Sequence, residues 1–251
     1  MLSLDKICLT LHANSPLECE LFHNLSLNVQ AGELAVILGG NGAGKSTLFN
    51  VITGFQPLNS GTVCVDNEDL MSLSVRERSQ RIAYVMQDPS VGTMKDLTIL
   101  ENMNFAYLRG CRRSPLRICQ KKRMDQFKDA LSILGLGLEN RLHENVSSLS
   151  GGQRQCLSLI MSTLQPSKVF LLDEITAALD PFMAEQVMKT AKEIVQKTQQ
   201  ATLMITHHLK HALKYGDKIY LLKKGQLICL KDQTIGKDLN VDSLIHIMFD
   251  E

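Results

Sequence analysis

The chain has 251 residues, of which 27 are lysine or arginine and 26 are aspartate or glutamate, so its net charge is +1. This balance lacks the basic excess that is typical of a general nucleic-acid binder, so no nucleic acid is expected as a partner. Hydrophobic residues make up 44% and charged residues 21%, proportions that exclude a disordered or fibrous chain. A chain of this length fits one large domain or two closely fused lobes, and it needs neither disulfide nor metal to stay folded.

The seven cysteines are scattered and show no CxxC spacing, which favours free thiols in a reducing compartment over a zinc site or a disulfide framework. No run of 18 apolar residues is present, and the N-terminal segment carries charges within its first six positions. Neither a membrane span nor a signal peptide is therefore predicted. We expect a cytoplasmic protein that reaches a membrane only through a partner.

Short apolar runs alternate with longer helical patterns, which favours an α/β fold with a parallel sheet. Turn residues and runs of strand length predict strands at 25–29, 33–39, 62–65, 82–86, 169–173, 201–206, 218–222 and 227–231. The last two are separated by KKGQ, which predicts a hairpin. Residues 97–150 contain helical patterns and no convincing strand, so we expect a helical lobe inserted between two stretches of sheet.

The segment GGNGAGKS, from Gly39 to Ser46, follows an apolar strand and precedes a helical pattern. It fits G-x-x-x-x-G-K-[ST], a phosphate-binding loop in the strand–loop–helix context that the motif requires. Glycines let backbone N–H groups converge on phosphate oxygens, and the helix N-terminus adds partial positive charge. Lys45 is expected to reach the β- and γ-phosphates, and Ser46 to offer its hydroxyl to Mg²⁺. A chance glycine-rich turn is the alternative, and the context argues against it.

Asp173 and Glu174 end the apolar run VFLLDE. The carboxyl ends of parallel strands gather at the ligand edge of a sheet. We therefore expect Asp173 to hold Mg²⁺ through its water shell and Glu174 to accept a proton from the attacking water. On its own such a pair is more often a helix cap or a surface pair, and the phosphate loop reverses that preference.

The segment LSGGQ (residues 149–153) precedes a long helical pattern. Ser150 and two glycines at a helix start form a second anion pocket. A two-fold dimer explains two pockets economically, because each copy then offers this pocket to the nucleotide held by the other. A plain helix cap explains the same residues equally well.

His207 and His208 follow the predicted strand at 201–206, and His211 lies four residues beyond His207. Spacing i, i+4 suits a metal pair on a helix, but no third ligand is evident. We expect instead that His207, the first polar side chain beyond the strand, reaches the γ-phosphate or the attacking water.

These motifs, in this order, resemble the ATP-binding cassette (ABC) ATPases over essentially the whole chain. The phosphate loop is similar to the family's Walker A loop, LSGGQ to its signature, VFLLDE to its Walker B strand and catalytic glutamate, and His207 to its switch histidine. Gln87 occupies the place of the Q-loop glutamine, and Ala178-Leu179-Asp180 resembles the D-loop. LSGGQ followed by LLDE at this spacing is highly specific.

The resemblance implies a P-loop NTPase of the ABC ATPase fold in one domain: residues 1–96 and 151–251 as a RecA-like core with an antiparallel β subdomain, and residues 97–150 as a helical subdomain including the signature. It implies catalysis by Glu174, His207, Gln87 and Lys45, and Mg²⁺ held by Ser46, Gln87 and Asp173. The implied ATP-binding residues are Gly39, Gly40, Asn41, Gly42, Ala43, Gly44, Lys45, Ser46, Thr47, Gln87, Ser150, Gly151, Gly152, Gln153 and Asp180.

The implied partners are a second copy, joined head to tail through ATP, and an integral membrane permease that docks on the helical subdomain from the cytoplasmic side. QDPSVGTMKDLTILEN and EITAALDP are similar to one branch of uptake-system ATPases. These pair with a permease like those for branched-chain amino acids and with an extracytoplasmic solute-binding protein, and tryptophan-like amino acids are among their proposed cargoes. Import of a small solute such as an amino acid follows as an expectation.

The chain departs from the family where an early aromatic residue usually stacks on adenine, because Leu11 and His12 stand near that place. Preference for ATP over GTP is therefore expected to be loose. Ile175 stands where proline is common and His208 where an acidic residue is common. The stretch from Arg109 to Arg123 carries seven basic residues and no acidic one, which indicates either a solvated face or a docking face.

Two other functions remain open at this point. A soluble ABC ATPase of an assembly complex, such as that of iron–sulfur cluster biogenesis, is the first, although LSGGQRQ and ALDP are more similar to transport ATPases. A nucleotide sensor without turnover is the second, and the presence of Glu174 and His207 argues against it.

Overall fold

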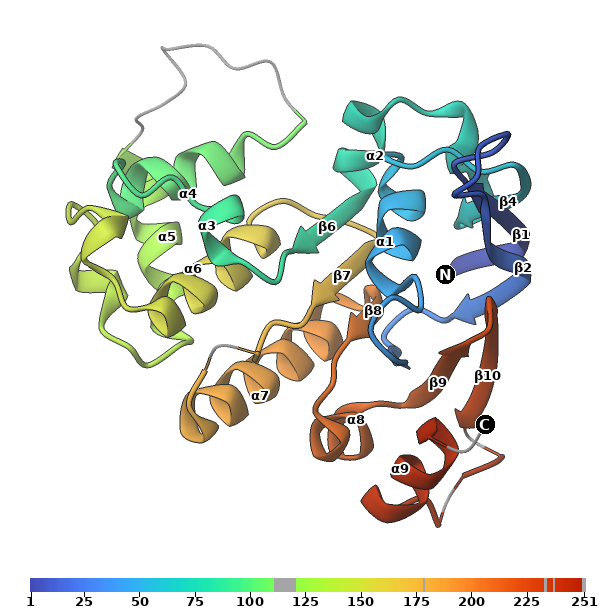
Figure 1. Ribbon diagram of the computed structural model, residues 1–251. Helices are drawn as coiled ribbons and strands as arrows, with labels where there is room; N and C mark the ends of the chain where they lie inside the picture. Colours follow the sequence, from blue (N-terminus) through green and yellow to red (C-terminus); the bar gives the residue numbers. More distant parts are fainter. Residues whose placement is uncertain (111–120, 178, 233, 237, 250–251) are drawn as a thin grey trace.

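The fold combines a mainly parallel sheet, a smaller antiparallel sheet and helices on both faces of the larger sheet (Figure 1). It is seen in a computed structural model that describes residues 1–110, 121–177, 179–232, 234–236 and 238–249. None of the helices in these ranges combines the length and apolar character that a bilayer crossing requires.

The larger sheet has six strands in the order β10-β9-β3-β8-β7-β6. All neighbouring pairs are parallel except β9 and β10, which form the predicted hairpin. Its central strands are buried on both faces, which explains their continuous apolar sequences. The strands are β3 (Leu34–Leu38), β6 (Ile82–Val85), β7 (Val169–Asp173), β8 (Ala201–Ile205), β9 (Lys218–Lys223) and β10 (Gln226–Lys231).

Side chains of each central strand alternate between two hydrophobic cores, one on each face of the sheet. On β3, Leu34, Val36 and Leu38 join one core, whereas Ala35 and Ile37 join the other. The second core also contains α1 (Lys45–Thr53), which lies between the two sheets (Figure 1). The helix that follows the phosphate loop is thereby fixed on both sides.

The antiparallel sheet has the order β2-β1-β4-β5. Its strands are β1 (Leu2–Leu11), β2 (Cys19–Val29), β4 (Ser60–Val65) and β5 (Glu68–Asp69). Neither β1 nor the first half of β2 is among the strands predicted from the sequence. In β1 the alternation of buried residues shifts between Leu4 and Ile7, where the register with β2 is interrupted and Lys6 has a positive φ. Such a bulge breaks the period of two that reveals a strand.

The first core is covered by helices on the face opposite α1. Within residues 97–150, the described parts form helices, with only an isolated bridge between Thr98 and Asn145. The helices and short 3-10 turns of the chain are η1 (Leu70–Ser72), α2 (Val75–Arg81), α3 (Pro89–Gly92), α4 (Ile99–Tyr107), α5 (Lys121–Ser132), η3 (Leu138–Asn140), η4 (Val146–Ser148), α6 (Gly151–Thr163), α7 (Pro181–Thr198), α8 (Leu209–Tyr215) and α9 (Val241–Phe249).

Only the ends of the basic run at 109–123 can be placed, because residues 111–120 lie outside the described part. The guanidinium group of Arg109 is hydrogen-bonded within the protein. It donates to the backbone oxygens of Ser162 (3.0 Å) and Gln165 (3.1 Å) at the end of α6. At the other end, the guanidinium of Arg123 lies over the ring of Tyr107. These two arginines therefore pack against the helical lobe.

Candidate functional site

The phosphate loop runs from the end of β3 into the first turn of α1. Gly44 is the N-cap residue of α1 with φ of 98°, a left-handed conformation that glycine adopts without strain. At the start of the loop a side chain on Gly39 would lie 2.7 Å from the backbone oxygen of Leu222. These two glycines let the backbone turn tightly against β9 and aim the N-terminus of α1 outward.

Lys45 is buried, and its ammonium group is held by the loop itself. Nζ donates to the backbone oxygens of Gly39 (2.8 Å) and Gly40 (2.9 Å). Burial lowers the pKa of Lys45, and the nearby carboxylates of Glu174 and Asp173 partly offset that effect. In this structure the ammonium group of Lys45 thus gives to two carbonyl oxygens the hydrogen bonds that it would give to a bound phosphate.

A cavity of about 280 Å³ lies over the loop. It brings together three groups that are distant in sequence: the loop itself, the residues that follow β7 and β8, and two leucines of the antiparallel sheet. Its lining comprises Leu11, Leu21, Asn41, Gly42, Gly44, Lys45, Ser46, Thr47, Glu174 and His207. Gly40 and Ala43 line an adjoining cavity together with Asn41 and Gly42.

Asp173 lies at the end of β7, within hydrogen-bond reach of Ser46 of the cavity, and is only 6% exposed. Burial raises the pKa of its carboxyl group, whereas hydrogen bonds from Tyr84 and Ser46 and the charge of Lys45 act in the opposite direction. The Tyr84 hydroxyl donates to Oδ2 at 3.2 Å. A buried carboxylate beside a serine hydroxyl supplies the hard oxygen atoms that Mg²⁺ prefers, so these two residues fit that ion.

Glu174 follows directly and has φ of 44°, an uncommon value for a residue with a side chain. Its N–H donates to the backbone oxygen of Ile205 on β8 at 2.9 Å, which fixes this turn. Local backbone strain of this kind often marks a functional residue. Because of this turn the two adjacent carboxylates point in different directions: Asp173 stays buried, whereas Glu174 reaches the cavity.

Both carboxylate oxygens of Glu174 are engaged. Nε2 of His207 lies 2.7 Å from Oε1, and Nε2 of Gln87 donates to Oε2 at 3.1 Å. The structure thus brings together three residues that the sequence placed after three different strands, β6, β7 and β8. A carboxylate held in this way at the rim of the cavity is oriented for proton transfer.

The histidine spacing does not make a metal pair in this structure. His207 faces Glu174, whereas Nε2 of His211 lies 3.7 Å from Oε2 of Glu185 on α7. Within the described ranges, no three His, Cys, Asp or Glu residues gather as a metal site would require.

The signature residues are not part of the cavity over the phosphate loop. Ser150 is the N-cap of α6: its Oγ accepts from the N–H of Gln153, and Oε1 of Gln153 accepts from the N–H of Ser150. This is the capping box, so the helix-cap interpretation describes this structure correctly. Gly151 faces open space, because a side chain built on it would meet nothing within 4 Å.

Asp180 likewise forms a helix cap. Its Oδ1 accepts from the N–H groups of Phe182 (3.1 Å) and Met183 (3.0 Å) at the start of α7. Ala178 of the same motif lies outside the described residues. Gly152 is near Leu179 of this segment, so the signature and the segment before α7 form one surface.

Leu11, near the expected adenine position, lines the cavity together with Leu21, whereas His12 is not part of its lining. The wall that an aromatic ring usually supplies is thus aliphatic here. The absence of an aromatic residue is evident from the sequence, whereas the place of Leu21 in the wall is not. Leu21 lies there because it belongs to β2, which pairs with β1, the strand that carries Leu11.

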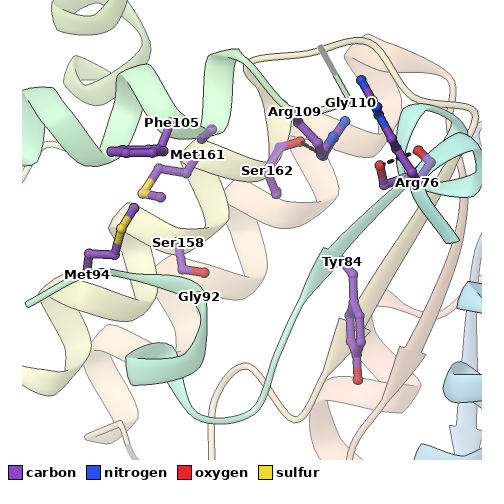
Figure 2. A pocket seen from close by; sticks show the side chains of 12 residues that line it. Arg76, Tyr84, Gly92, Met94, Phe105, Arg109, Gly110, Ser158, Met161 and Ser162 are labelled. Atoms are coloured by element: carbon purple, nitrogen blue, oxygen red, sulfur yellow. Dashed lines mark hydrogen bonds between the residues drawn. The ribbon is translucent and has the colours of Figure 1, made fainter. Parts of the chain in front are cut away.

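A groove of about 720 Å³ lies between the α6 side of the helical lobe and β6 (Figure 2). A docking groove formed by apolar residues of this lobe is expected from the resemblance, but its lining residues are not predictable from the sequence. Apolar side chains of Met94, Phe105 and Met161 gather at one end, and Arg76 and Arg109 lie at the other. Arg76 comes from α2 and Arg109 follows α4, so only the folded chain joins them.

Comparisons with known proteins agree with this geometry. The family model described as "ABC transporter" matches residues 22–177. The tyrosine transport ATP-binding protein of Clostridioides difficile is 40% identical over 90% of this chain and 89% of its own length. The thiamine import ATP-binding protein ThiQ of Vibrio cholerae is 31% identical over 92% and 90%, respectively.

A solved structure of the ATP-binding cassette MJ0796, a dimer in a post-hydrolysis state with ADP and phosphate, is also similar. It has a TM-score of 0.77 and 26% identity, and the match covers 90% of this chain and 96% of that one. The phosphate loop, the Glu174 site and these matches lead to one conclusion: the chain belongs to the ABC transporter family, in which it is an ATP-binding cassette and an ATPase.

Proposed function

We propose that the chain is the ATPase subunit of an importer for a small solute, an aromatic amino acid in the first place. The observation that carries the catalytic part is the cavity that joins the phosphate loop to Glu174 and His207. The cargo rests on the tyrosine transport relative at 40% identity over most of both chains. An ATPase subunit does not touch the cargo, so the cargo is inferred through that relative alone.

Each residue of the cavity has a separate task in this proposal. The triphosphate replaces the two carbonyl oxygens that now hold Lys45, and the loop N–H groups surround the phosphates. Ser46 and Asp173 hold Mg²⁺, with Gln87 as a further ligand. The ion, when bound, neutralises charge that develops on the phosphate oxygens.

Glu174 accepts a proton from the water that attacks the γ-phosphorus as the bond to the β–γ bridging oxygen breaks. His207 and Gln87, which already contact its two oxygens, keep the carboxylate in the required orientation. The products are ADP and phosphate, and no covalent intermediate with the protein is needed.

The active unit is a head-to-tail dimer. Ser150 and Gly151 do not line the cavity of their own chain, yet Gly151 is open to approach. The hydroxyl proton of Ser150 is not used by the cap, because Oγ acts there as acceptor. We infer that a second copy presents these residues, with Gly152, Gln153 and Asp180 nearby, to the nucleotide. ATP then stabilises the closed dimer by mass action.

The groove of Figure 2 is the docking site of the permease. One end of the groove is apolar and the other end carries two arginines. No carboxylate is among the described residues that line it. The buried Nε of Arg109 has no hydrogen-bond partner within the described chain. An amphipathic helical segment that brings an acceptor to the arginines and apolar side chains to the methionines is complementary to it. The chain would then lie on the cytoplasmic face of the membrane, in a system with an extracytoplasmic solute-binding protein.

A pull-down from detergent-solubilised membranes tests the proposal. A tagged protein is expected to retain an integral membrane permease, and Met94→Glu, at an exposed groove residue, is expected to lose it. Ile133→Glu is the matched control, because Ile133 is an exposed apolar residue outside the groove lining, at 51% exposure against 39% for Met94. Recovery of soluble assembly-scaffold proteins in place of a permease would contradict the transport role.

A further inference from the structure

Tyr84 is the residue that the groove and the nucleotide site share. Tyr84 lines the groove and an adjoining cavity of about 190 Å³. Its hydroxyl donates to Oδ2 of Asp173 at 3.2 Å. In Figure 2 the hydroxyl end points away from Arg76 and Gly110. One residue therefore borders the proposed permease site and also hydrogen-bonds to the buried carboxylate.

The position of Tyr84 is fixed by strand pairing and by a ring contact. β6 pairs in parallel with β7, so that Tyr84 lies beside Leu171, and Asp173 follows two residues later on the same face of the sheet. The ring also packs edge-on against Phe49 of α1, with centroids 5.7 Å apart and an interplanar angle of 86°. A ring held in this way transmits a displacement of the groove wall to its hydroxyl, because a packed side chain has little room to absorb it.

The hydrogen bond from Tyr84 stabilises the buried carboxylate of Asp173. Asp173 is nearly inaccessible to water, and a buried carboxylate is costly unless donors satisfy its oxygens. Tyr84 engages one of the two oxygens, Oδ2, and thereby limits rotation of the carboxylate beside Ser46. Loss of the hydroxyl would leave the carboxylate both less stabilised and less well oriented.

We propose that Tyr84 is a positioning residue that orients the Asp173 carboxylate for Mg²⁺ and links it to the occupant of the groove. The inference rests on the proposed function for the Mg²⁺ role of Asp173 and for docking of the permease in the groove. Tyr84 itself touches neither nucleotide nor metal in this proposal. It acts through Asp173.

The first experiment measures binding rather than turnover. In a Glu174→Gln background, the dissociation constant of a fluorescent ATP analogue is measured with excess Mg²⁺ and with EDTA, and the ratio gives the affinity gained from Mg²⁺. Tyr84→Phe keeps the ring and its contact with Phe49. We expect this change to reduce the ratio by about threefold to tenfold, the usual net value of one hydrogen bond. Affinity in EDTA should change by less than about twofold.

Tyr215→Phe is the matched control. The Tyr215 hydroxyl also donates to a carboxylate, at 2.6 Å from Oε1 of Glu185, but neither residue lines the cavity over the phosphate loop. Its Mg²⁺ ratio should equal that of the parent. If Tyr84→Phe gives the parent ratio, or weakens binding equally with and without Mg²⁺, the positioning role is overturned.

The second experiment tests the link to the groove. The same ratios are measured on the solubilised complex with its permease. We expect the permease to change the ratio by at least about threefold in the parent and by less than about twofold in Tyr84→Phe, since one hydrogen bond carries an effect of this size. Equal changes in both overturn the link and leave the positioning role standing. If no permease is retained, the docking part of the proposed function fails, while the ratios of the free protein still decide the role of Tyr84.

Discussion

Glu174 and His207 meet across two neighbouring strands of the central sheet, with Oε1 of the glutamate 2.7 Å from Nε2 of the histidine. The glutamate follows β7 and the histidine lies just beyond β8. Their contact depends on the parallel register of these strands, in which Asp173 lies beside Ile205. The register places the ends of the two strands, and with them these two side chains, at one edge of the sheet.

Replacement of Glu174 by glutamine is expected to reduce ATP hydrolysis by at least about a hundredfold, because the amide cannot accept the proton. The isosteric side chain should preserve the fold and leave an ATP-dependent dimer. Phosphate release and size-exclusion chromatography measure the two effects. Glu185→Gln, which also faces a histidine but lies outside the cavity, should retain turnover. Hydrolysis at the original rate in Glu174→Gln would show that another group is the general base.

Replacement of Lys45 by alanine should weaken nucleotide binding by about tenfold to a hundredfold, because a charge-assisted contact with phosphate is lost. Equilibrium binding of a fluorescent ATP analogue measures the change. Lys192→Ala removes a cation that pairs with Asp217 at 2.7 Å on the surface and should bind as tightly as the unaltered protein. Unchanged affinity in Lys45→Ala would remove the phosphate-loop assignment.

Two adjacent glycines of the loop should respond differently to alanine. At Gly39 a methyl group would meet the backbone oxygen of Leu222 at 2.7 Å, whereas at Gly40 it would meet nothing within 4 Å. We expect Gly39→Ala to lower the free energy of unfolding by about 1–3 kcal/mol, the usual cost of overpacking. Gly40→Ala should change it little. Urea denaturation of both variants measures the difference, and equal stabilities would contradict the close approach of the loop to β9.

The aliphatic wall near the loop predicts weak discrimination between purine nucleotides. Leu11 and Leu21 give apolar contact with any base but no stacking surface. ATP and GTP are expected to bind with dissociation constants that agree within about fivefold, since neither leucine carries a polar group that reads a base edge. Leu11→Tyr should tighten both by about threefold to tenfold through stacking. A strong preference of the unaltered protein for ATP would point to a base contact elsewhere.

The short motifs were readable from sequence because their geometry is local. A phosphate loop needs only a strand, a run of glycines and a helix start, all of which are contiguous from 34 to 53. The apolar strands β3, β7 and β8 were equally plain, since burial on both faces leaves no polar position. By contrast β1 escaped notice because a bulge near Lys6 interrupts its alternation.

Contacts between side chains of different elements required the folded chain. The hydrogen bond from Tyr84 to Asp173 depends on which strand lies beside β7. The sequence of a strand does not specify which strand becomes its neighbour in the sheet. The groove with Arg76 and Arg109 depends on how the helical lobe is set against β6. Sequence alone determined the chemistry available to this protein, because residue types and local turns specify it. The tertiary structure decided which groups act together, because strand register and helix packing set distances that sequence separation does not.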